Sequence, residues 1–430
     1  MSEEVKKTPG QLTDEYIEYY NKKIGEKHPA VVVAKTKPGE KADFFNTELW
    51  REYVTTDVIR EHAMVVGDFN PLWRDEEYAN KSVWGGMIGS PLFLYSMGGT
   101  PGLPVPLQVK GWLGFAGGGT TEFYQPFRPG EKVIAEDVWL GYKDISKPES
   151  GHRLFIETAQ RRMSSAERGL LCACTYTAPN WAPLSDEQQK EFDAQKAAQG
   201  ATGEGAKKKK KDKNDRPYHF YTDEELEVVY RNYEDEASGK LRRGDNPRYF
   251  EDVKVGDNLG IVMKGPINAG DLGAFNTIFP GRANADQYMW GVAAGDKKAM
   301  PRDPHTNQLT STANFHMDDD IAKILGVPRA LNFGLAEEMY CGHVISNWMS
   351  DYGWIRKFTG RTYAMNLKGD VMTLTGEVKK VYEENGRGLV DVEITGTEFS
   401  GLKLVGANAT VQLPHKGNPE EVVKAVLAGK

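Results

Sequence analysis

The sequence has few cysteines, no long apolar run and no excess of positive charge, and each of these shortages excludes a class of protein. Its three cysteines, at positions 172, 174 and 341, are odd in number and lack zinc-ligand spacing, so we expect neither a disulfide framework nor a metal site. No apolar run reaches the roughly 18 residues that a membrane span needs, and the polar N-terminus lacks the apolar core of a secretory signal. The net charge of -7 gives no general attraction to nucleic acid. We therefore expect a cytoplasmic protein that binds neither membranes nor nucleic acid.

The 430 residues are too many for one ordinary core, and a hydrophobic content of 39% with 27% charged residues fits a soluble protein of two domains. Between about Ser185 and Asp215 the chain is polar and contains the unbroken run Lys207–Lys211. We interpret this segment as a mobile linker, although five lysines could also bind an anionic partner such as nucleic acid or the phosphates of CoA. The domains that follow are an N-terminal domain 1–182, a polar lysine-rich linker 183–239, a C-terminal domain 240–418 and a tail 419–430.

Both domains end in runs that are rich in β-branched and aromatic residues, that alternate in polarity, and that are bounded by turn residues. The predicted strands are Lys132–Tyr142, Arg153–Arg161 and Gly169–Thr177 in the first domain and Asp370–Tyr382, Gly388–Thr397 and Lys403–Leu413 in the second. Each domain also has one apolar helix candidate ahead of its strands, at Pro91–Met97 and Leu335–Met349. One helix lying on a curled antiparallel sheet, twice over, is an α+β design.

A direct alignment indicates an internal repeat. The string from Trp73 through Asp75 to Ala79 lies over the string from His316 through Asp318 to Ala322. Twelve residues after each of these alanines comes the start of the helix candidate, which is Pro91 in one copy and Gly334 in the other. The equal spacing favours a duplicated domain.

The most informative string is Gly67-Asp68-Phe69-Asn70-Pro71-Leu72-Trp73, which follows a predicted helix Asp57–Val65 with Thr56 as its N-cap. Glycine permits unusual backbone angles, and asparagine before proline favours a turn. One interpretation is that Asp68 and Asn70 only hold this turn through hydrogen bonds to the backbone. The other is that they carry chemistry.

At this string the chain resembles the MaoC-like (R)-specific enoyl-CoA hydratase family, whose motif is Gly-Asp-x-Asn-Pro-aliphatic-His followed by an alanine and a glycine-rich approach to the central helix. Gly67, Asp68, Asn70 and Ala79 fit this pattern, and Trp84-Gly85-Gly86-Met87 fits the approach. The second half is similar to the same family at Phe250–Asp257, Lys264–Ile267 and Phe315–Asp318. The resemblance implies two tandem hot-dog domains, each an antiparallel sheet wrapped around a central helix, that form a pseudo-dimer.

The resemblance also implies roles for individual residues. Hydration of an enoyl thioester needs a base beside a water molecule, a proton source near Cα, and donors to the thioester oxygen. By resemblance Asp68 is the acid/base and Asn70 orients Asp68 or the loop, while Trp73, Trp84, Gly86 and Gly334 are the expected substrate-binding residues. Gly334 would offer its backbone amide at a helix N-terminus, where developing negative charge is stabilised.

The two copies keep different parts of this machinery. Trp73 stands where the family has its histidine and cannot take up a proton, and Pro91 at the first helix start has no N–H. The second copy has His316 and Gly334, but Ser311 and Ala313 occupy its aspartate and asparagine positions.

Three hypotheses follow for the catalytic pair. Asp68 could work with another proton carrier or with water, Asp68 and His316 could converge at one site, or the chain could bind without turnover. His305 is a further candidate proton carrier in a loop, whereas we expect His343, inside the apolar helix, to be a packed core residue. We read the glycine-rich string 114–119 as a bent strand near the pocket and not as a phosphate loop, because it lacks the Lys-Ser/Thr ending.

We therefore predict a lyase, a hydratase or dehydratase that reversibly hydrates an enoyl-CoA with a bulky or aromatic acyl group, using Asp68, Asn70 and His316 and no metal or redox cofactor. The alternatives are a non-catalytic acyl-CoA-binding subunit of a larger complex and a hot-dog thioesterase. We expect acyl-CoA as the small-molecule partner and a homo-oligomer, for example a dimer.

Overall fold

The computed structural model describes residues 21–32, 48–101, 116–145, 152–183, 212–278 and 301–430, together with short pieces at 18, 113–114, 190–191, 193–194 and 197. The run Lys207–Lys211 lies outside these residues, so its predicted role stays a prediction. No helix in the described part of the chain combines the length and apolar character that crossing a membrane requires.

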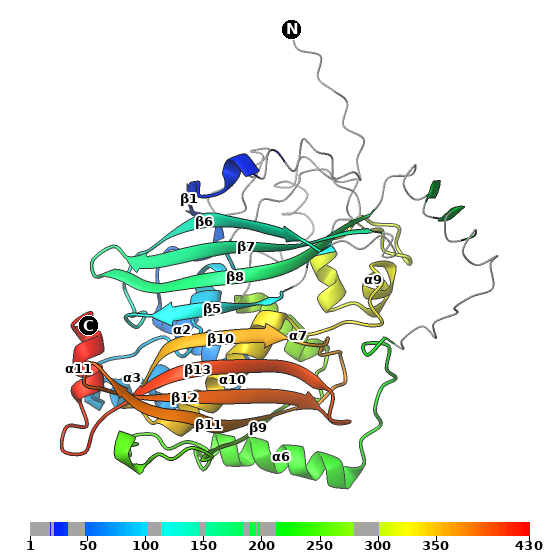
Figure 1. The fold of residues 1–430 in the computed structure, drawn as a ribbon. Helices are drawn as coiled ribbons and strands as arrows, with labels where there is room; N and C mark the ends of the chain where they lie inside the picture. The colour runs from blue at the N-terminus through cyan, green and yellow to red at the C-terminus, as the bar shows by residue number, and fades with distance from the viewer. Residues whose placement is uncertain are drawn as a thin grey trace.

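One antiparallel sheet runs through the whole molecule in the order β1-β6-β7-β8-β5-β10-β13-β12-β11-β9, with β4 paired to β8 (Figure 1). Its strands in the first half of the chain, the N half, are β1 (Lys27–Pro29), β4 (Leu113–Gly114), β5 (Gly118–Phe123), β6 (Val133–Asp144), β7 (His152–Ser165) and β8 (Gly169–Pro183). Those of the second half, the C half, are β9 (Asn258–Lys264), β10 (Trp354–Thr362), β11 (Met372–Glu384), β12 (Arg387–Glu398) and β13 (Lys403–Leu413). All six strands predicted from the alternating patterns are confirmed.

In each half the central helices and short helical turns lie between the first strand of this sheet, β1 or β9, and the remaining strands. In the N half they are α2 (Thr56–Val66), η2 (Pro71–Trp73), α3 (Glu76–Lys81) and α4 (Leu94–Gly98). In the C half they are α7 (Ala269–Ile278), η6 (Thr312–His316), α9 (Asp319–Ile324) and α10 (Gly334–Met349). α10 confirms the clearer helix prediction, and it packs against β9 to β13 with every residue after Gly334 buried. α4 is shorter than the predicted Pro91–Met97. It begins only at Leu94, because Leu92 takes a left-handed conformation that a helix cannot include.

The two halves are copies of one plan. Counted outward from the junction of β5 with β10, the strands follow the same order on both sides. Asp75 and Asp318, which the sequence alignment pairs, are the N-caps of α3 and α9. Each accepts hydrogen bonds from the backbone N–H groups two and three residues further along the chain. Tyr95 of α4 donates a hydrogen bond of 2.6 Å to Glu338 of α10, and the two residues are as far apart in the chain as Trp73 and His316. The α+β class and the duplicated domain are therefore confirmed.

The junction needs glycine. β5 and β10 pair over three residues, from Thr120 opposite Thr359 to Glu122 opposite Lys357. Gly118 opens β5 with a φ of 111°, and a Cβ on it would lie 2.2 Å from the carbonyl oxygen of Gly360. The glycine-rich string therefore leads into β5, a strand as predicted, at the junction of the two halves, which we call the seam. Only a residue without a side chain lets the two backbones approach this closely.

Two helices lie in segments that the sequence analysis treated as linker and tail. α6 (Asp223–Ala237) lies within 183–239, where Thr222 and Glu225 form a capping box, and it packs along β9 at the edge of the sheet (Figure 1). α11 (Glu421–Leu427) lies within 419–430 and buries three valines. In both helices the polar faces hid the apolar residues that dock them, and α11 is in addition only 7 residues long.

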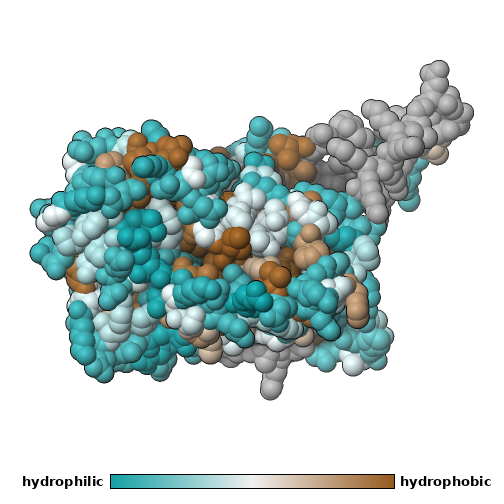
Figure 2. All heavy atoms as spheres, turned by 90° about the horizontal axis from the view of Figure 1, so that it is seen from below, coloured by the Kyte–Doolittle hydropathy of each residue, from teal (hydrophilic) through white to brown (hydrophobic). Residues whose placement is uncertain are grey.

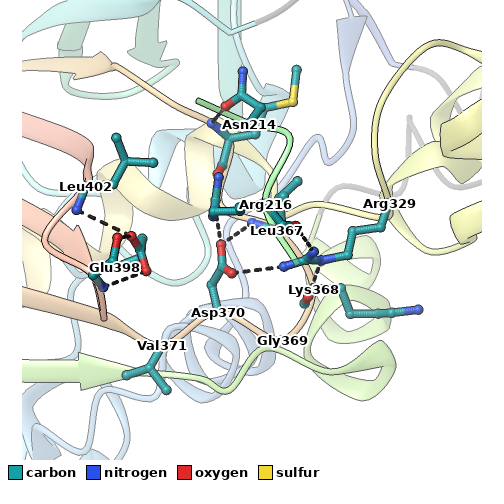
Figure 3. Close-up of polar contacts among 12 residues, drawn as sticks. Asn214, Arg216, Arg329, Leu367, Lys368, Gly369, Asp370, Val371, Glu398 and Leu402 are labelled. Atoms are coloured by element: carbon teal, nitrogen blue, oxygen red, sulfur yellow. Dashed lines mark hydrogen bonds and ion pairs between the residues drawn. The ribbon is translucent and has the colours of Figure 1, made fainter. Parts of the chain in front are cut away.

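The chain that leads into α6 is fixed to the C half through Asp370 (Figure 3). The carboxylate of Asp370 pairs with the guanidinium groups of Arg216 and Arg329 and accepts the N–H of Leu367 at 2.8 Å. In the N half Glu131 makes a similar set of contacts, since its carboxylate pairs with Arg168 and accepts the N–H of Arg128 at 3.1 Å. The start of α6 is therefore anchored by charge-assisted hydrogen bonds.

The face of the molecule seen from below is mostly hydrophilic, with hydrophobic atoms gathered near its middle (Figure 2). This distribution fits the 27% of charged residues and is ordinary for a globular surface.

Candidate functional site

The Gly-Asp-x-Asn-Pro string forms a tight loop after α2. The side chain of Thr55, one residue before the predicted cap, caps α2 by accepting the N–H of Val58 at 3.2 Å. Gly67 ends the helix in the left-handed conformation, with a φ of 70°. Asp68 then accepts the N–H of Asn70 at 2.9 Å, and Asn70 accepts the N–H of Leu72 at 3.0 Å. Both polar side chains do hold the turn, but each also has a contact outside it.

Asp68 belongs to a buried group of charges that joins four parts of the chain. We call Asp68, Glu236, Lys264 and His343 the charge cluster. His343, in α10, places its Nε2 3.1 Å from Glu236 of α6 and 3.7 Å from Asp68. Lys264, the last residue of β9, has its Nζ 3.0 Å from the Nδ1 of His343 and donates to the carbonyl oxygen of Val66 at 2.6 Å.

The members of the charge cluster shift one another's pKa values. Burial by itself would raise the pKa of Glu236, but hydrogen bonds from His343 and Asn347 lower it to about 2. Burial lowers the pKa of Lys264 to about 8, although Glu236 and Asp68 both act to raise it.

Three members of the cluster could in principle hold a metal ion. The ligand atoms of Asp68, Glu236 and His343 lie within 4.8 Å of one another and all three residues are buried. Lys264 already supplies a positive charge to this group, and a divalent ion would be repelled by it at short range. The donor set therefore fits a cluster that already contains the Lys264 cation better than a metal centre.

An apolar pocket lies next to the loop, between the two halves. We call it the aromatic pocket. From the N half it is lined by Asn70, Leu72, Trp73, Trp84, Ile88, Gly89, Ser90, Pro91, Phe93, Phe123, Gln125, Pro126 and Phe127, and from the C half by Ser346, Met349, Ser350, Asp351, Gly353, Trp354 and Ile355. It is narrow, since the centre of a water molecule can move through only about 40 Å³ of it.

Asn70 connects the charge cluster to the aromatic pocket. Its backbone N–H donates to Asp68, and its side-chain amide donates to the carboxylate of Asp351 at 3.2 Å. Asp68 itself is 3% exposed and is not among the residues that line the pocket. The aspartate of the motif therefore lies behind Asn70, on the side of the charge cluster.

The substrate-binding residues expected from the resemblance separate into two groups. Trp73 and Trp84 line the pocket, and the Nε1 of Trp73 is buried without a hydrogen-bond partner among the described residues. Gly86 and Gly334 do not line it, and a Cβ on Gly334 would lie 2.7 Å from Ala116 of the N half. Gly334 is thus a packing position where α10 begins against the other half.

The histidines expected to act do not meet Asp68. His316 stacks on Phe333 with ring centroids 3.8 Å apart, and its Nδ1 lies 2.9 Å from the carbonyl oxygen of Leu331. His305 pairs with Asp320 at 2.9 Å on the surface. The hypothesis that Asp68 and His316 share one site finds no contact in the described structure, where it is His343 that lies beside Asp68.

Sequence reasoning missed four residues of the two sites. His343 was assigned to core packing because it lies in an apolar helix, and Glu236 fell in the expected linker. Lys264 was noted only as part of a family-like string, and Asp351 was not singled out. No local spacing marks these residues, since each reaches the site from a different part of the chain. The one available signal for His343 was an ionisable side chain within the mostly apolar α10.

Comparison with known proteins agrees with this architecture. Residues 44–165 match the family model described as FAS1-like, dehydratase domain region. A comparison of the sequence with curated proteins finds no match. A solved structure of a MaoC-like dehydratase superposes with a TM-score of 0.54 and 16% identity over 92% of this chain and 99% of that one. A MaoC domain protein dehydratase from Chloroflexus aurantiacus J-10-fl gives 0.53 and 12% over 96% and 99%.

The fold is therefore that of two tandem hot-dog domains fused as a pseudo-dimer. The family model and the shared fold confirm the resemblance to MaoC-like dehydratases.

Proposed function

We propose that the protein is a hydro-lyase that reversibly adds water to an enoyl-CoA, with the acyl group in the aromatic pocket. The observation that carries this proposal is the position of the Gly-Asp-x-Asn-Pro loop, which touches the pocket with Asn70 and the charge cluster with Asp68. A dehydratase-type region in the family comparison supports the same class of reaction.

In this proposal Asp68 removes the proton from the attacking water. The loop lacks the histidine of the family motif, because Trp73 stands in that position. His343 lies 3.7 Å from Asp68 and supplies an imidazole in its place. Because Asp68 lies behind Asn70 and the pocket is narrow, substrate binding must move the loop 67–73 to admit the water and the acyl chain. The addition of water needs only acid and base groups, so the proposal includes no metal or redox cofactor.

Trp73 and its neighbours would bind the thioester. The unpartnered Nε1–H of Trp73 can donate to the thioester oxygen, a role that Pro91 at the helix start cannot fill. Five further aromatic side chains line the pocket and favour a bulky or aromatic acyl group over a short one; they are Trp84, Phe93, Phe123, Phe127 and Trp354.

The experiment is a comparison of cinnamoyl-CoA with crotonyl-CoA, following loss of the enone absorbance. We expect faster hydration of cinnamoyl-CoA and at least a roughly 100-fold loss of kcat in Asp68→Asn, because removal of an acid/base group costs about two to four powers of ten. Asp75→Asn is the matched control, since asparagine also caps α3 and Asp75 is exposed. Full activity in Asp68→Asn would show that Asp68 only holds the turn.

A second candidate is a non-catalytic acyl-CoA-binding subunit. It is favoured by Trp73 in the histidine position and by the absence of Asp68 from the pocket wall. The same assay separates the possibilities: binding of cinnamoyl-CoA without any absorbance change supports this subunit, and release of free CoA thiol supports a thioesterase. Either result would overturn the hydratase proposal.

A further inference from the structure

We propose that Asp351 is a second catalytic residue, the proton donor to Cα of the thioester bound in the aromatic pocket. This inference rests on the proposed function and adds a group that the motif does not contain. Hydration needs a base for the water and an acid for Cα. Asp68 can serve as the first, while Asp351 is the one titratable side chain among the residues that line the pocket.

Asp351 is held in place from three sides. Its carboxylate accepts the hydroxyl of Tyr78 at 2.5 Å and the amide of Asn70 at 3.2 Å. Its backbone carbonyl accepts the Nε1–H of Trp84 at 2.7 Å, and its N–H donates to Gly244 at 2.8 Å. An acid fixed by partners on α3, on the motif loop and on the segment after α6 has the rigidity that proton transfer at one defined atom requires.

The backbone before Asp351 is also unusual. Ser350, which ends α10, has a φ of 69°, a conformation that costs a non-glycine residue free energy. This turn stops the helix and brings Ser350, Asp351 and Gly353 to the pocket wall. Residues held in such conformations cluster at functional sites.

The surroundings keep the Asp351 carboxyl able to carry a proton. Burial raises the pKa of Asp351, while the hydrogen bonds from Tyr78 and Asn70 and the charge of Arg242 lower it, and Asp245 raises it. The phenol of Tyr352, the next residue in the chain, is the remaining titratable neighbour. The net direction is upward, toward a group that is protonated closer to neutral pH than an ordinary aspartic acid.

The step balances with these two carboxyl groups. The oxygen of water forms a bond to Cβ and its proton passes to the Asp68 carboxylate. The electron pair of the Cα=Cβ bond, held briefly as an enolate, forms a bond to the proton of the Asp351 carboxyl group, which leaves a carboxylate. After product release Asp68 loses a proton to solvent and Asp351 gains one, so the net change is the addition of one water.

The first test is Asp351→Asn with cinnamoyl-CoA. We expect a loss of kcat of roughly 100-fold or more with an unchanged melting temperature, because asparagine has the same shape and cannot release a proton. In the wild type, hydration should decline as pH rises through the pKa of Asp351. Tyr78→Phe removes a hydrogen bond that lowers this pKa, so the decline should move to higher pH, which a purely structural role of Tyr78 would not cause.

The second test does not depend on hydration. In D2O the protein should exchange the Cα hydrogens of saturated 3-phenylpropionyl-CoA, as followed by NMR, and this exchange should require Asp351 and survive Asp68→Asn. Exchange that depends on Asp351 without any hydration of cinnamoyl-CoA would overturn the proposed function and keep this inference. Unchanged kcat in Asp351→Asn, or exchange that does not need Asp351, would overturn the inference and leave the proposed function standing.

Discussion

Glu236 and His343 meet at 3.1 Å inside the charge cluster, and this contact makes part of the stability dependent on pH. The pKa of Glu236 in the fold is about 2, below its ordinary value of 4.5. A carboxyl group with a lowered pKa contributes stability that is complete above pH 4.5 and is lost as the pH falls toward 2. The contribution above that range is about 3 kcal/mol at 1.4 kcal/mol for each pKa unit.

We predict that Glu236→Gln lowers the free energy of unfolding by about 3 kcal/mol at pH 7 and by progressively less as the pH falls toward 2. Urea unfolding at pH 7 and at pH 3 measures this difference. Glu227→Gln on the same helix is the control, because Glu227 is exposed and, among the described residues, forms an ion pair only with Arg231 at the surface. Equal losses at the two pH values would mean that Glu236 acts through packing and not through charge.

At the scale of elements, the two central helices meet through one buried acid. Glu338 of α10 accepts the hydroxyl of Tyr95 of α4, and burial raises its pKa to about 8 although this hydrogen bond lowers it. A group with a raised pKa contributes stability that is complete below pH 4.5 and is lost as the pH rises through 8. The contact between the helices is therefore built for a protonated acid.

We predict that Glu338→Gln is about as stable as the wild type at pH 4.5 and more stable at pH 9, by on the order of 5 kcal/mol, because glutamine cannot ionise. Melting temperatures measured between these pH values test the trend. In a chain that keeps Glu338, Tyr95→Phe should raise the pH at which the stability declines, since the tyrosine hydrogen bond lowers the pKa of Glu338. A pH trend unchanged by either substitution would contradict this reading of the contact.

At the scale of the whole molecule, the fusion of the two halves depends on the short pairing of β5 with β10. The site spans this fusion, since the motif loop belongs to the N half and both His343 and Asp351 belong to the C half. A change at the seam should therefore affect the site from a distance.

We predict that Gly118→Ala destabilises the protein by roughly 2–4 kcal/mol, because a Cβ there meets the backbone of Gly360 and the residue has a positive φ. Gly130→Ala has the same type of φ with open space around it, so it reports the conformational strain alone, about 1–2 kcal/mol. Urea unfolding of the two variants gives the difference. Equal losses would show that the seam tolerates a side chain.

Residue patterns in the chain were enough to predict the main strands of the two halves and the central helix α10. Alternation over Lys132–Tyr142 or Lys403–Leu413 is a local signal of a half-buried strand, and the apolar periodicity of Leu335–Met349 is a local signal of a buried helix. The spacing of Asp75 and Asp318 revealed the repeat because both residues cap the same helix in their own copy. Two of the motif's neighbours, Trp73 and Trp84, were likewise placed at the pocket by the resemblance.

The sequence by itself determined the strands, the long helix, the duplication and the turn chemistry of the motif loop, since each of these depends on residues near one another in the chain. Only the tertiary structure decided which ionisable groups meet. Asp68, Glu236, Lys264 and His343 come from a loop, a helix, a strand and another helix, and their contacts arise from the pseudo-symmetric closure of the two halves. Long-range contacts of this kind have no spacing rule, because the free energy that selects them is the burial and balance of charge in the assembled fold.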